Sequence, residues 1–236
     1  MTPVLFLPGL LCDATLWRAQ IDGLADMVAP MVADLTLDQT VAGMARRTLA
    51  AAPPRFALVA LSMGGYVAFE ILRQAPERVT GLALFDTSAA PDAPERAAGR
   101  HAAIESLELG RFRGVTSRLL PQLVHPRHVD GPLAETVQAM ASRVGGTAFA
   151  RQQRAILDRP DSRPILPTIT VPTLVAVGKD DVLTPPADAA EIHAGIPHAR
   201  LEVLPECGHL PALEQPERTT ELIRDLLRRC PSADRR

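Results

Sequence analysis

The sequence has few cysteines, a single lysine and no long apolar run, and each shortage excludes a class of protein. Its 236 residues contain three cysteines, which are too few and too widely spaced for a disulfide framework and fit a reducing compartment. No apolar stretch approaches the ~18–20 residues that cross a bilayer. The opening MTPVLFLPG lacks the charged region and cleavage site of a signal peptide. We therefore expect a cytoplasmic protein that does not bind membranes.

The charge composition argues against nucleic acid as the main partner. The chain has 25 basic and 27 acidic residues and a net charge of −2, so it lacks the basic excess that attracts phosphates. Lys179 is the only lysine, which we attribute, with the abundance of alanine and proline, to coding bias. The apolar fraction of 47% lies in the range of folded domains and excludes a disordered chain.

Short apolar runs alternate along the chain with longer segments of helical periodicity. The runs are apolar throughout, which is typical of parallel strands that are covered by helices on both faces. The expected buried strands are Val4–Leu7, Val28–Leu37, Phe56–Leu61, Leu82–Phe85, Thr173–Val177 and Leu201–Leu204. The expected helices include Val41–Ala52, Tyr66–Gln74 and Glu217–Arg229. The sequence therefore predicts an open α/β sheet.

The alternation stops between residues 91 and 160, where the composition is helical and no strand is expected. This segment contains ten arginines against seven acidic residues, so it is more basic than the rest of the chain. A helical block inserted between two strands of an α/β sheet is typical of a cap. We expect an α/β core at 1–90 and 161–230, a helical cap at 91–160 and a frayed tail at 231–236.

Ser62 lies between an expected strand and an expected helix, in the sequence ALSMGG. Small residues at Ala60, Gly64 and Gly65 permit a sharp turn that lifts the serine side chain above the N-terminus of the helix, where backbone N–H groups attract negative charge. The pattern is A-x-S-x-G rather than G-x-S-x-G. An ordinary N-cap serine has the same context, so this pentapeptide alone leaves catalysis and capping open.

A serine nucleophile needs a base and a carboxylate that orients the base. His209 lies in the loop ECGHL after the last expected strand, where it can reach across the carboxyl edge of the sheet. Three carboxylates compete for the second role: the neighbours Asp180 and Asp181, and Asp86 after an earlier strand. Turn capping is the alternative role of each aspartate.

Acyl transfer also needs hydrogen-bond donors for an oxyanion. One candidate is the backbone N–H of Met63, the residue after Ser62. The other is the N–H of Leu10, because Gly9 permits a tight turn after the first strand and Pro8 has no N–H to donate. An ordinary Pro-Gly turn is the alternative.

With these motifs in place, the chain resembles the α/β-hydrolase superfamily, especially its small cap-bearing esterases related to pimeloyl-carrier-protein methyl ester esterase. The order serine, aspartate, histidine is that of the superfamily. The similarity covers nearly the whole chain through FLPGLLCDATLW, ALSMGG, FDTSA, RQQRAILDRPDSRPIL, PTLVAVGKDDVLTPP and CGHLPALEQPE. It implies an acid three residues after Gly178, which selects Asp181, and it places Glu214 and Pro216 in their usual positions.

The sequence departs from the superfamily pattern at three points. Pro8 replaces the usual histidine, Ala60 replaces the first glycine of the serine motif, and the chain begins at what resembles the third strand, so the first hairpin is missing. We therefore expect about six strands, all parallel, with Val28–Leu37 at one edge. An exposed edge is prone to pairing, which predicts a homodimer or a covering element there.

The resemblance implies a serine hydrolase that cleaves a carboxylic ester through an acyl-enzyme, with Ser62, His209 and Asp181 as its triad and no metal or organic cofactor. Leu10 and Phe149 are expected to contact the acyl group of a small-molecule ester. C–C bond or thioester hydrolysis on the same triad is one alternative. A non-catalytic ligand-binding protein of the same fold is the other. The natural substrate is not predicted, because it depends on the shape of the cap.

The remaining polar residues receive structural interpretations. His125 and His128 stand three residues apart, but no third metal ligand is near in the sequence, which favours surface histidines. Cys12 and Cys207 are interpreted as packing residues. Five arginines of the cap could receive an acidic acyl carrier protein, although a solvated helix face is the simpler interpretation. They are Arg96, Arg100, Arg111, Arg113 and Arg118.

Overall fold

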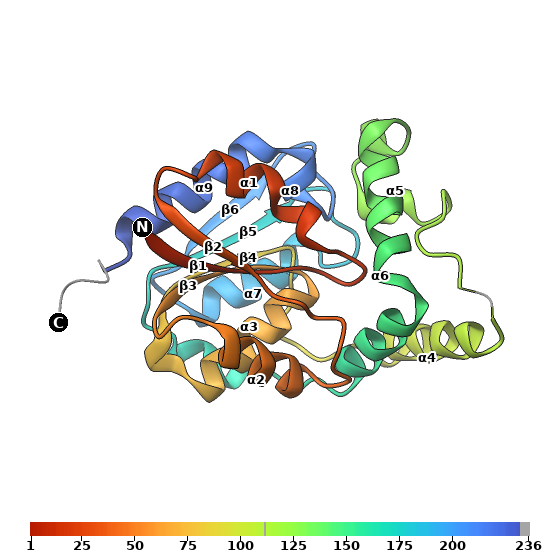
Figure 1. Ribbon diagram of the computed structural model, residues 1–236, viewed down its shortest axis with the longest axis horizontal. Coiled ribbons are helices and arrows are strands. Elements are labelled where there is room, and N and C mark those ends of the chain that lie inside the picture. Colours follow the sequence, from red (N-terminus) through yellow and green to blue (C-terminus); the bar gives the residue numbers. More distant parts are fainter. Residues whose placement is uncertain (111, 232–236) are drawn as a thin grey trace.

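The apolar runs of the sequence form one parallel sheet, seen in a computed structural model that describes residues 1–110 and 112–231 (Figure 1). The strand order is β2-β1-β3-β4-β5-β6, and every neighbouring pair is parallel. The strands are β1 (Thr2–Leu7), β2 (Val28–Val32), β3 (Phe56–Leu61), β4 (Val79–Phe85), β5 (Thr173–Gly178) and β6 (Arg200–Leu204). This confirms the predicted six-stranded α/β sheet with β2 at an edge.

Helices cover both faces of this sheet (Figure 1). One face carries α1 (Arg18–Gly23), α8 (Pro211–Glu214) and α9 (Pro216–Arg229). The other face carries α2 (Val41–Ala51), α3 (Met63–Gln74) and α7 (Pro186–Gly195). Every residue of the central strands β3 and β4 is buried. These two strands are almost entirely apolar, with Thr80 as the exception, because both of their faces are covered.

The two edge strands are less buried than the sequence predicts. The strand expected at 201–204 is present as β6, but its expected burial is wrong, since Leu201 is only partly buried and Val203 is 45% exposed. In β2, Ala29 and Pro30 are exposed, and the strand ends at Val32 rather than at residue 37. An edge strand has a neighbour on one side only, so apolar residues there do not guarantee burial.

In the segment without expected strands, the described residues form a short 3-10 helix, Pro126–His128, and three α-helices beyond the carboxyl ends of the strands (Figure 1). They are α4 (Pro94–Glu108), α5 (Leu120–Leu123) and α6 (Pro132–Leu157). Helix α6 is interrupted at Gly145, where φ is 75° and ψ is 171°, a conformation that is essentially restricted to glycine. The kink changes the direction of the helix axis, so that the half of α6 after Gly145 runs in a different direction from the half before it. That half carries Phe149, Gln152 and Gln153 toward the carboxyl edge of the sheet.

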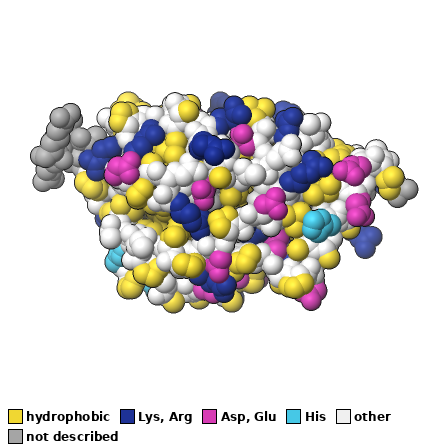
Figure 2. All heavy atoms as spheres, turned by 90° about the horizontal axis from the view of Figure 1, so that it is seen from below, with side chains coloured by type: hydrophobic (Ala, Val, Ile, Leu, Met, Phe, Trp, Pro, Cys, Tyr) yellow, Lys and Arg dark blue, Asp and Glu magenta, His cyan; other side chains and the backbone are white. Residues whose placement is uncertain are grey.

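The surface has no single sign of charge on the face seen from below. Figure 2 shows basic and acidic side chains interspersed there among apolar ones. Many of the charged side chains form ion pairs at the surface. Examples are Arg47 with Asp38 at 2.7 Å and Arg163 with Asp161 at 2.6 Å. Within the described residues, each helix is too short or too polar to cross a bilayer. Arg111 and residues 232–236, named in the cap and tail predictions, lie outside the described residues.

Candidate active site

Ser62 occupies a strained turn between β3 and α3. Its backbone has φ 55° and ψ −118°, which is unusual for a residue with a side chain and is typical of functional sites. The turn is held from both sides, because Ser62 N donates to Phe85 O at 3.0 Å and Thr87 Oγ1 donates to Ser62 O at 2.8 Å. Helix α3 begins at Met63, three residues before the predicted start, because the turn runs directly into the helix.

Two glycines allow α3 to pass close to its neighbours. A Cβ atom at Gly64 would lie 2.2 Å from Leu7 O, and one at Gly65 would lie 2.3 Å from Thr87 Oγ1. Any larger residue at either position would push the helix away from the sheet and displace the serine. Ala60, which departs from the usual glycine, is fully buried within β3, so its methyl group is accommodated without opening the turn.

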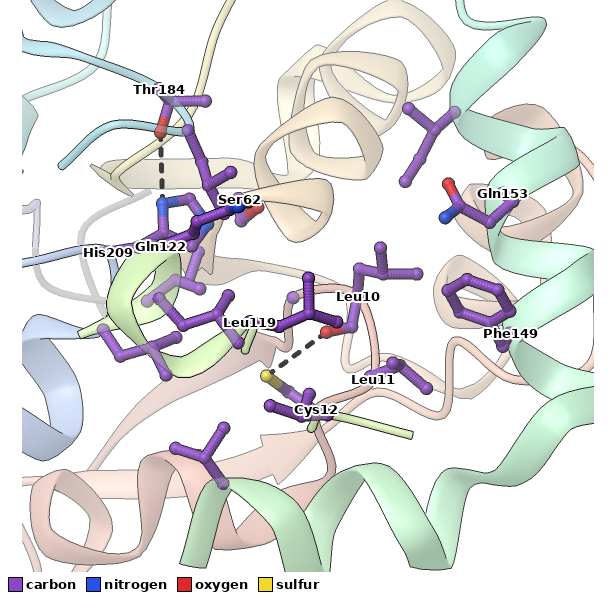
Figure 3. A pocket seen from close by; sticks show the side chains of 18 of the residues that line it. Leu10, Leu11, Cys12, Ser62, Leu119, Gln122, Phe149, Gln153, Thr184 and His209 are labelled. Carbon is purple, nitrogen blue, oxygen red and sulfur yellow. Dashed lines mark hydrogen bonds between the residues drawn. The ribbon is translucent and has the colours of Figure 1, made fainter. Parts of the chain in front are cut away.

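His209 and Asp181 meet in a buried hydrogen bond. Their Nδ1 and Oδ2 atoms are 2.8 Å apart, and both residues are nearly inaccessible to solvent. Thr184 Oγ1 donates to the same Asp181 oxygen at 2.7 Å and lies 3.3 Å from His209 Nδ1. Both of these contacts involve Nδ1 of the imidazole. The other ring nitrogen, Nε2, is therefore free to interact with groups in the pocket that His209 and Ser62 both line (Figure 3).

The local charges favour an ionised Asp181. Burial by itself would raise the pKa of this carboxyl. The charge and hydrogen bond of His209, together with the hydrogen bonds from Thr184 and from the backbone N–H of Leu183, outweigh burial and hold the pKa below its usual value. The carboxylate is therefore negative beside the imidazole, as the stabilisation of an imidazolium requires.

The two competing aspartates lie in different places. Asp180 points away from His209, and its carboxylate is 44% exposed and lies 3.9 Å from His125 Nε2. Asp86 is buried beside the pair, with Oδ1 accepting from Gly178 N at 2.8 Å, but it forms no hydrogen bond with the imidazole. Burial raises the pKa of Asp86 well above its usual range, and the negative charge of Asp181 raises it further. Of the three candidates, Asp181 is the one that contacts His209.

Two backbone N–H groups lie near Ser62, that of Met63 at the start of α3 and that of Leu10 in a tight turn after β1. Cys12 N donates to Gly9 O at 3.1 Å and closes the turn, and Leu11 adopts a positive φ of 59°. Within the described part of the chain, the N–H groups of Leu10 and Met63 have no hydrogen-bond acceptor. The turn packs closely against the serine, since a Cβ at Gly9 would lie 2.9 Å from a methyl group of Leu61 and 3.4 Å from Ser62 Cβ.

Gln152, on the second half of α6, holds this turn in place. Its side chain is fully buried and accepts from Leu11 N at 3.1 Å while donating to Leu35 O at 3.2 Å. The amide therefore fixes the peptide group between Leu10 and Leu11. The sequence analysis includes Gln152 in the segment RQQRAILDRPDSRPIL but gives this residue no role. Its contact with Leu11 joins residues 141 apart in the chain, and neither periodicity nor motif spacing indicates such a contact.

The loop that carries His209 is organised by the buried carboxylate of Glu214. This carboxylate accepts hydrogen bonds from Gly208 N and Leu210 N, each at 3.1 Å, and from His125 N at 2.7 Å. His209 N in turn donates to Leu123 O at 3.1 Å. The histidine loop is thus tied to the segment around α5.

The pocket between the sheet and the three helices is a cavity of about 410 Å³. In Figure 3, Ser62 and His209 lie on one side, Phe149 and Gln153 on the other, and Leu10 and Leu119 between them. Most of its other lining residues are apolar, including Leu11, Val115, Val137, Met140, Ile156 and Leu210. Phe149 packs against Phe112 with ring centroids 5.6 Å apart. Both predicted pocket residues, Leu10 and Phe149, therefore line the cavity.

The remaining polar candidates are dispersed. His125 lies beside Asp180, whereas His128 accepts a hydrogen bond from Arg127. Within residues 1–110 and 112–231, the one cluster with three metal-ligand side chains is Asp86, Asp181 and His209. Cys12 and Cys207 are buried, and burial raises the pKa of the Cys12 thiol to about 12, so this thiol is protonated and poorly nucleophilic near neutral pH.

The sheet order and the serine turn between β3 and α3 together define an α/β-hydrolase. Residues 4–222 match the alpha/beta hydrolase family, and the chain belongs to that family. It is similar to the pimeloyl-[acyl-carrier protein] methyl ester esterase of Neisseria meningitidis, with 30% identity over 175 residues that cover 70% of this chain and 67% of that protein.

Solved structures give the same picture. A malate-bound thermophilic esterase from Thermogutta terrifontis is 32% identical, has a TM-score of 0.86, and is matched over 97% of this chain and 90% of that one. The enol-lactonase of Burkholderia xenovorans shares the fold with a TM-score of 0.83 at 21% identity, over 96% and 91% of the two chains. The names of the two relatives at 30% and 32% identity, both esterases, support an ester hydrolase.

Proposed function

We propose that this protein is a serine esterase that hydrolyses a carboxylic ester through an acyl-enzyme, with Ser62 as nucleophile, His209 as base and Asp181 as orienting acid. The observation that carries the proposal is the buried 2.8 Å hydrogen bond between His209 and Asp181 at a pocket that Ser62 also lines. A serine on a strained strand-to-helix turn, a histidine and a carboxylate in this chain order form the catalytic group of α/β-hydrolases.

The chemistry begins when Ser62 Oγ attacks the ester carbonyl and His209 Nε2 accepts the hydroxyl proton. Asp181 accepts the Nδ1 hydrogen and stabilises the imidazolium that forms. The imidazolium then protonates the departing alcohol. Water attacks the acyl-enzyme in the same way and releases the acid. Ser62 Oγ has no hydrogen bond with a described residue, and contacts of this kind tighten when the substrate binds. These steps require no metal or cofactor.

The N–H groups of Leu10 and Met63 would hold the oxyanion of each tetrahedral intermediate. Their lack of an acceptor among the described residues makes both available, and each donor of this type contributes about 10²–10³ in rate. The acyl group would then extend past Leu10 toward Phe149. Residues 91–160 would act as a cap over this acyl pocket, with 1–90 and 161–230 as the core.

Removal of the nucleophile tests this proposal. We expect Ser62→Ala to lower kcat by about 10⁶, as in serine hydrolases generally, while circular dichroism and the melting temperature show an intact fold. A fluorophosphonate probe should add one adduct to the wild-type protein and none to Ser62→Ala, by intact-protein mass spectrometry. Absence of an adduct on the folded wild-type protein would instead support a non-catalytic ligand-binding role.

The proposal also covers the substrate, a carrier protein for it and the cellular location of the enzyme. A small-molecule ester fits the mainly apolar pocket. An acyl carrier protein as substrate carrier is suggested by the name of the Neisseria relative and by Arg113 and Arg118, which are exposed in the proposed cap. A cytoplasmic location is suggested by three cysteines that are all free thiols.

A further inference from the structure

Polar side chains from α3, α4 and α6 also line the pocket, although most of its lining residues are apolar. Figure 3 shows the amide of Gln153 facing the cavity from α6, across from Ser62 and His209. Arg100, on α4, and Tyr66, on α3, line the same cavity. We refer to Arg100, Gln153 and Tyr66 as the donor cluster.

The donor cluster has more hydrogen-bond donors than acceptors. Gln153 Oε1 accepts from Arg100 Nη1 at 2.7 Å, which orients the amide so that its NH₂ group is the free end. That NH₂ group, Arg100 Nη2 and the Tyr66 hydroxyl donate to none of the described residues. Gln153 and Tyr66 are each only 5% exposed, and burial raises the pKa of Tyr66, so its hydroxyl stays protonated.

The charge around the donor cluster is positive. Asp92 forms ion pairs with both Arg100 and Arg159, so two guanidinium groups share one carboxylate. Arg159 also lies over the face of the Tyr66 ring, 4.2 Å from its centroid. Arg96, at the pocket rim, donates to Leu183 O. Among the described residues that line the pocket, none is acidic.

We propose that the donor cluster binds a carboxylate at the far end of the acyl chain, so that the substrate is a half-ester of a dicarboxylic acid. This inference rests on the proposed esterase function. Free N–H and O–H donors beside an excess guanidinium are satisfied by an anionic acceptor, and a carboxylate accepts several donors at once. Leu10, Phe149 and Ile156 line the same cavity and are suited to contact the methylene chain between the two carboxyl groups.

A neutral acyl chain of the same length would leave these donors without partners. A hydrogen bond that involves a charged group contributes about 1.5–3 kcal/mol, which corresponds to about a tenfold to hundredfold difference in affinity. The donor cluster therefore selects between esters that differ only in the group at the end of the chain.

Binding to the Ser62→Ala protein tests the site without turnover. The ligands are monomethyl adipate and methyl hexanoate, which carry a carboxylate and a methyl group, respectively, at the far end of the chain. We expect calorimetry to show at least tenfold tighter binding of monomethyl adipate. Gln153→Glu in the same background should remove this preference, because the new carboxylate still accepts from Arg100 but cancels the excess positive charge.

The control is Arg154→Gln, which removes a cation from α6 that pairs with Glu108 and does not line the pocket. Its preference for monomethyl adipate should equal that of Ser62→Ala alone. Equal binding of the two ligands, or an unchanged preference in Gln153→Glu, would overturn the proposal. If the site selects the half-ester but the wild-type protein hydrolyses no ester, the proposed function fails and the carboxylate site stands. If neutral esters are hydrolysed and the two ligands bind equally, the proposed esterase function stands and the carboxylate site fails.

Discussion

Asp86 is a buried carboxyl group that the proposed mechanism does not use. It is 1% exposed, adopts a positive φ of 44°, and has one oxygen, Oδ2, without a hydrogen-bond partner in the described structure. Its other oxygen accepts from Gly178 N at 2.8 Å and so supports the end of β5, from which the acid loop begins. A neutral acceptor serves this purpose as well as a charged one.

The raised pKa of Asp86 predicts a pH-dependent stability difference between the wild-type protein and Asp86→Asn. Below the pKa of an unfolded aspartate, about 3.9, Asp86 is protonated in both states and the two proteins should differ little. As the pH rises toward the higher folded pKa, the unfolded state ionises first, and the wild type loses up to about 1.4 kcal/mol per pH unit. Asparagine has no such loss.

We therefore expect Asp86→Asn to gain stability relative to the wild type as the pH rises above about 4. Urea unfolding of both proteins between acidic and neutral pH measures this difference. A difference that is constant with pH would mean that Asp86 ionises at its ordinary pKa.

The hydrogen bonds of Gln152 predict that this residue of α6 affects the rate of the chemical step. Gln152→Met should free the peptide between Leu10 and Leu11, so that Leu11 can leave its strained positive φ and Leu10 N–H loses its orientation. We expect kcat to fall by up to about 10²-fold, with little change in KM. Steady-state kinetics on an activated ester measures both constants. Lower stability with unchanged kcat would indicate that Gln152 has a structural role only.

For single residues, the sequence identifies which side chains belong to the candidate site but not the direction in which each side chain points. Ser62 and His209 are recognised because small residues and strand ends surround them. The choice of Asp181 over Asp180 depends on resemblance, since adjacent loop residues point in different directions that the tertiary structure sets. Thr184 is missed, although a threonine three residues after an aspartate is a turn signal.

Among the elements, helices α6 and α4 each contain an open glycine, and the two glycine-to-alanine changes should have opposite effects on stability. A Cβ would meet no atom within 4 Å at Gly145 or at Gly99, so neither substitution creates a clash. Gly145 has a positive φ of 75°, and alanine there should lower the free energy of unfolding by about 1–3 kcal/mol. Gly99 lies inside α4, where alanine should raise it by about 0.5–1 kcal/mol.

Thermal or urea unfolding of the two variants measures these changes. The Gly99→Ala protein is the matched control, because it adds the same methyl group at an equally open position. A Gly145→Ala protein as stable as the wild type would show that α6 can straighten without loss, and that the kink is not imposed by the fold.

The elements are predicted most accurately where the sheet is buried on both faces. Residues 56–61 are predicted as a strand with the boundaries that the structure shows. The predicted strand at 28–37 is five residues too long at its end, because an edge strand lacks the continuous burial that marks its limits. The kink of α6 is not predicted, since Gly145-Gly146 also occurs inside regular helices and only the dihedral angles distinguish the two cases.

For the whole molecule, the exposed edge of the sheet at β2 is the place where the sequence predicts pairing between copies of the chain. The homodimer expected from the sequence stays a prediction, and Pro30 lies in the middle of the edge strand β2, where it pairs with Val4. Proline has no N–H to donate, which weakens edge-to-edge pairing. If copies associate through β2, Pro30→Val should lower the dissociation constant of the dimer.

Size-exclusion chromatography with light scattering, over a range of protein concentrations, measures this association. Identical monomeric profiles for the wild type and Pro30→Val would contradict a homodimer through β2. An unchanged dimer in both proteins would place the interface elsewhere.

The position of the second half of α6 has a consequence for protein engineering. Three neighbouring side chains of this half serve different parts of the pocket, since Phe149 lines its wall, Gln152 holds the turn after β1 and Gln153 belongs to the donor cluster. A chimera that receives the whole helix from a relative would exchange selectivity and turnover together. Grafts that are intended to change only which acyl group the pocket accepts should therefore keep Gln152 and vary Phe149 and Gln153.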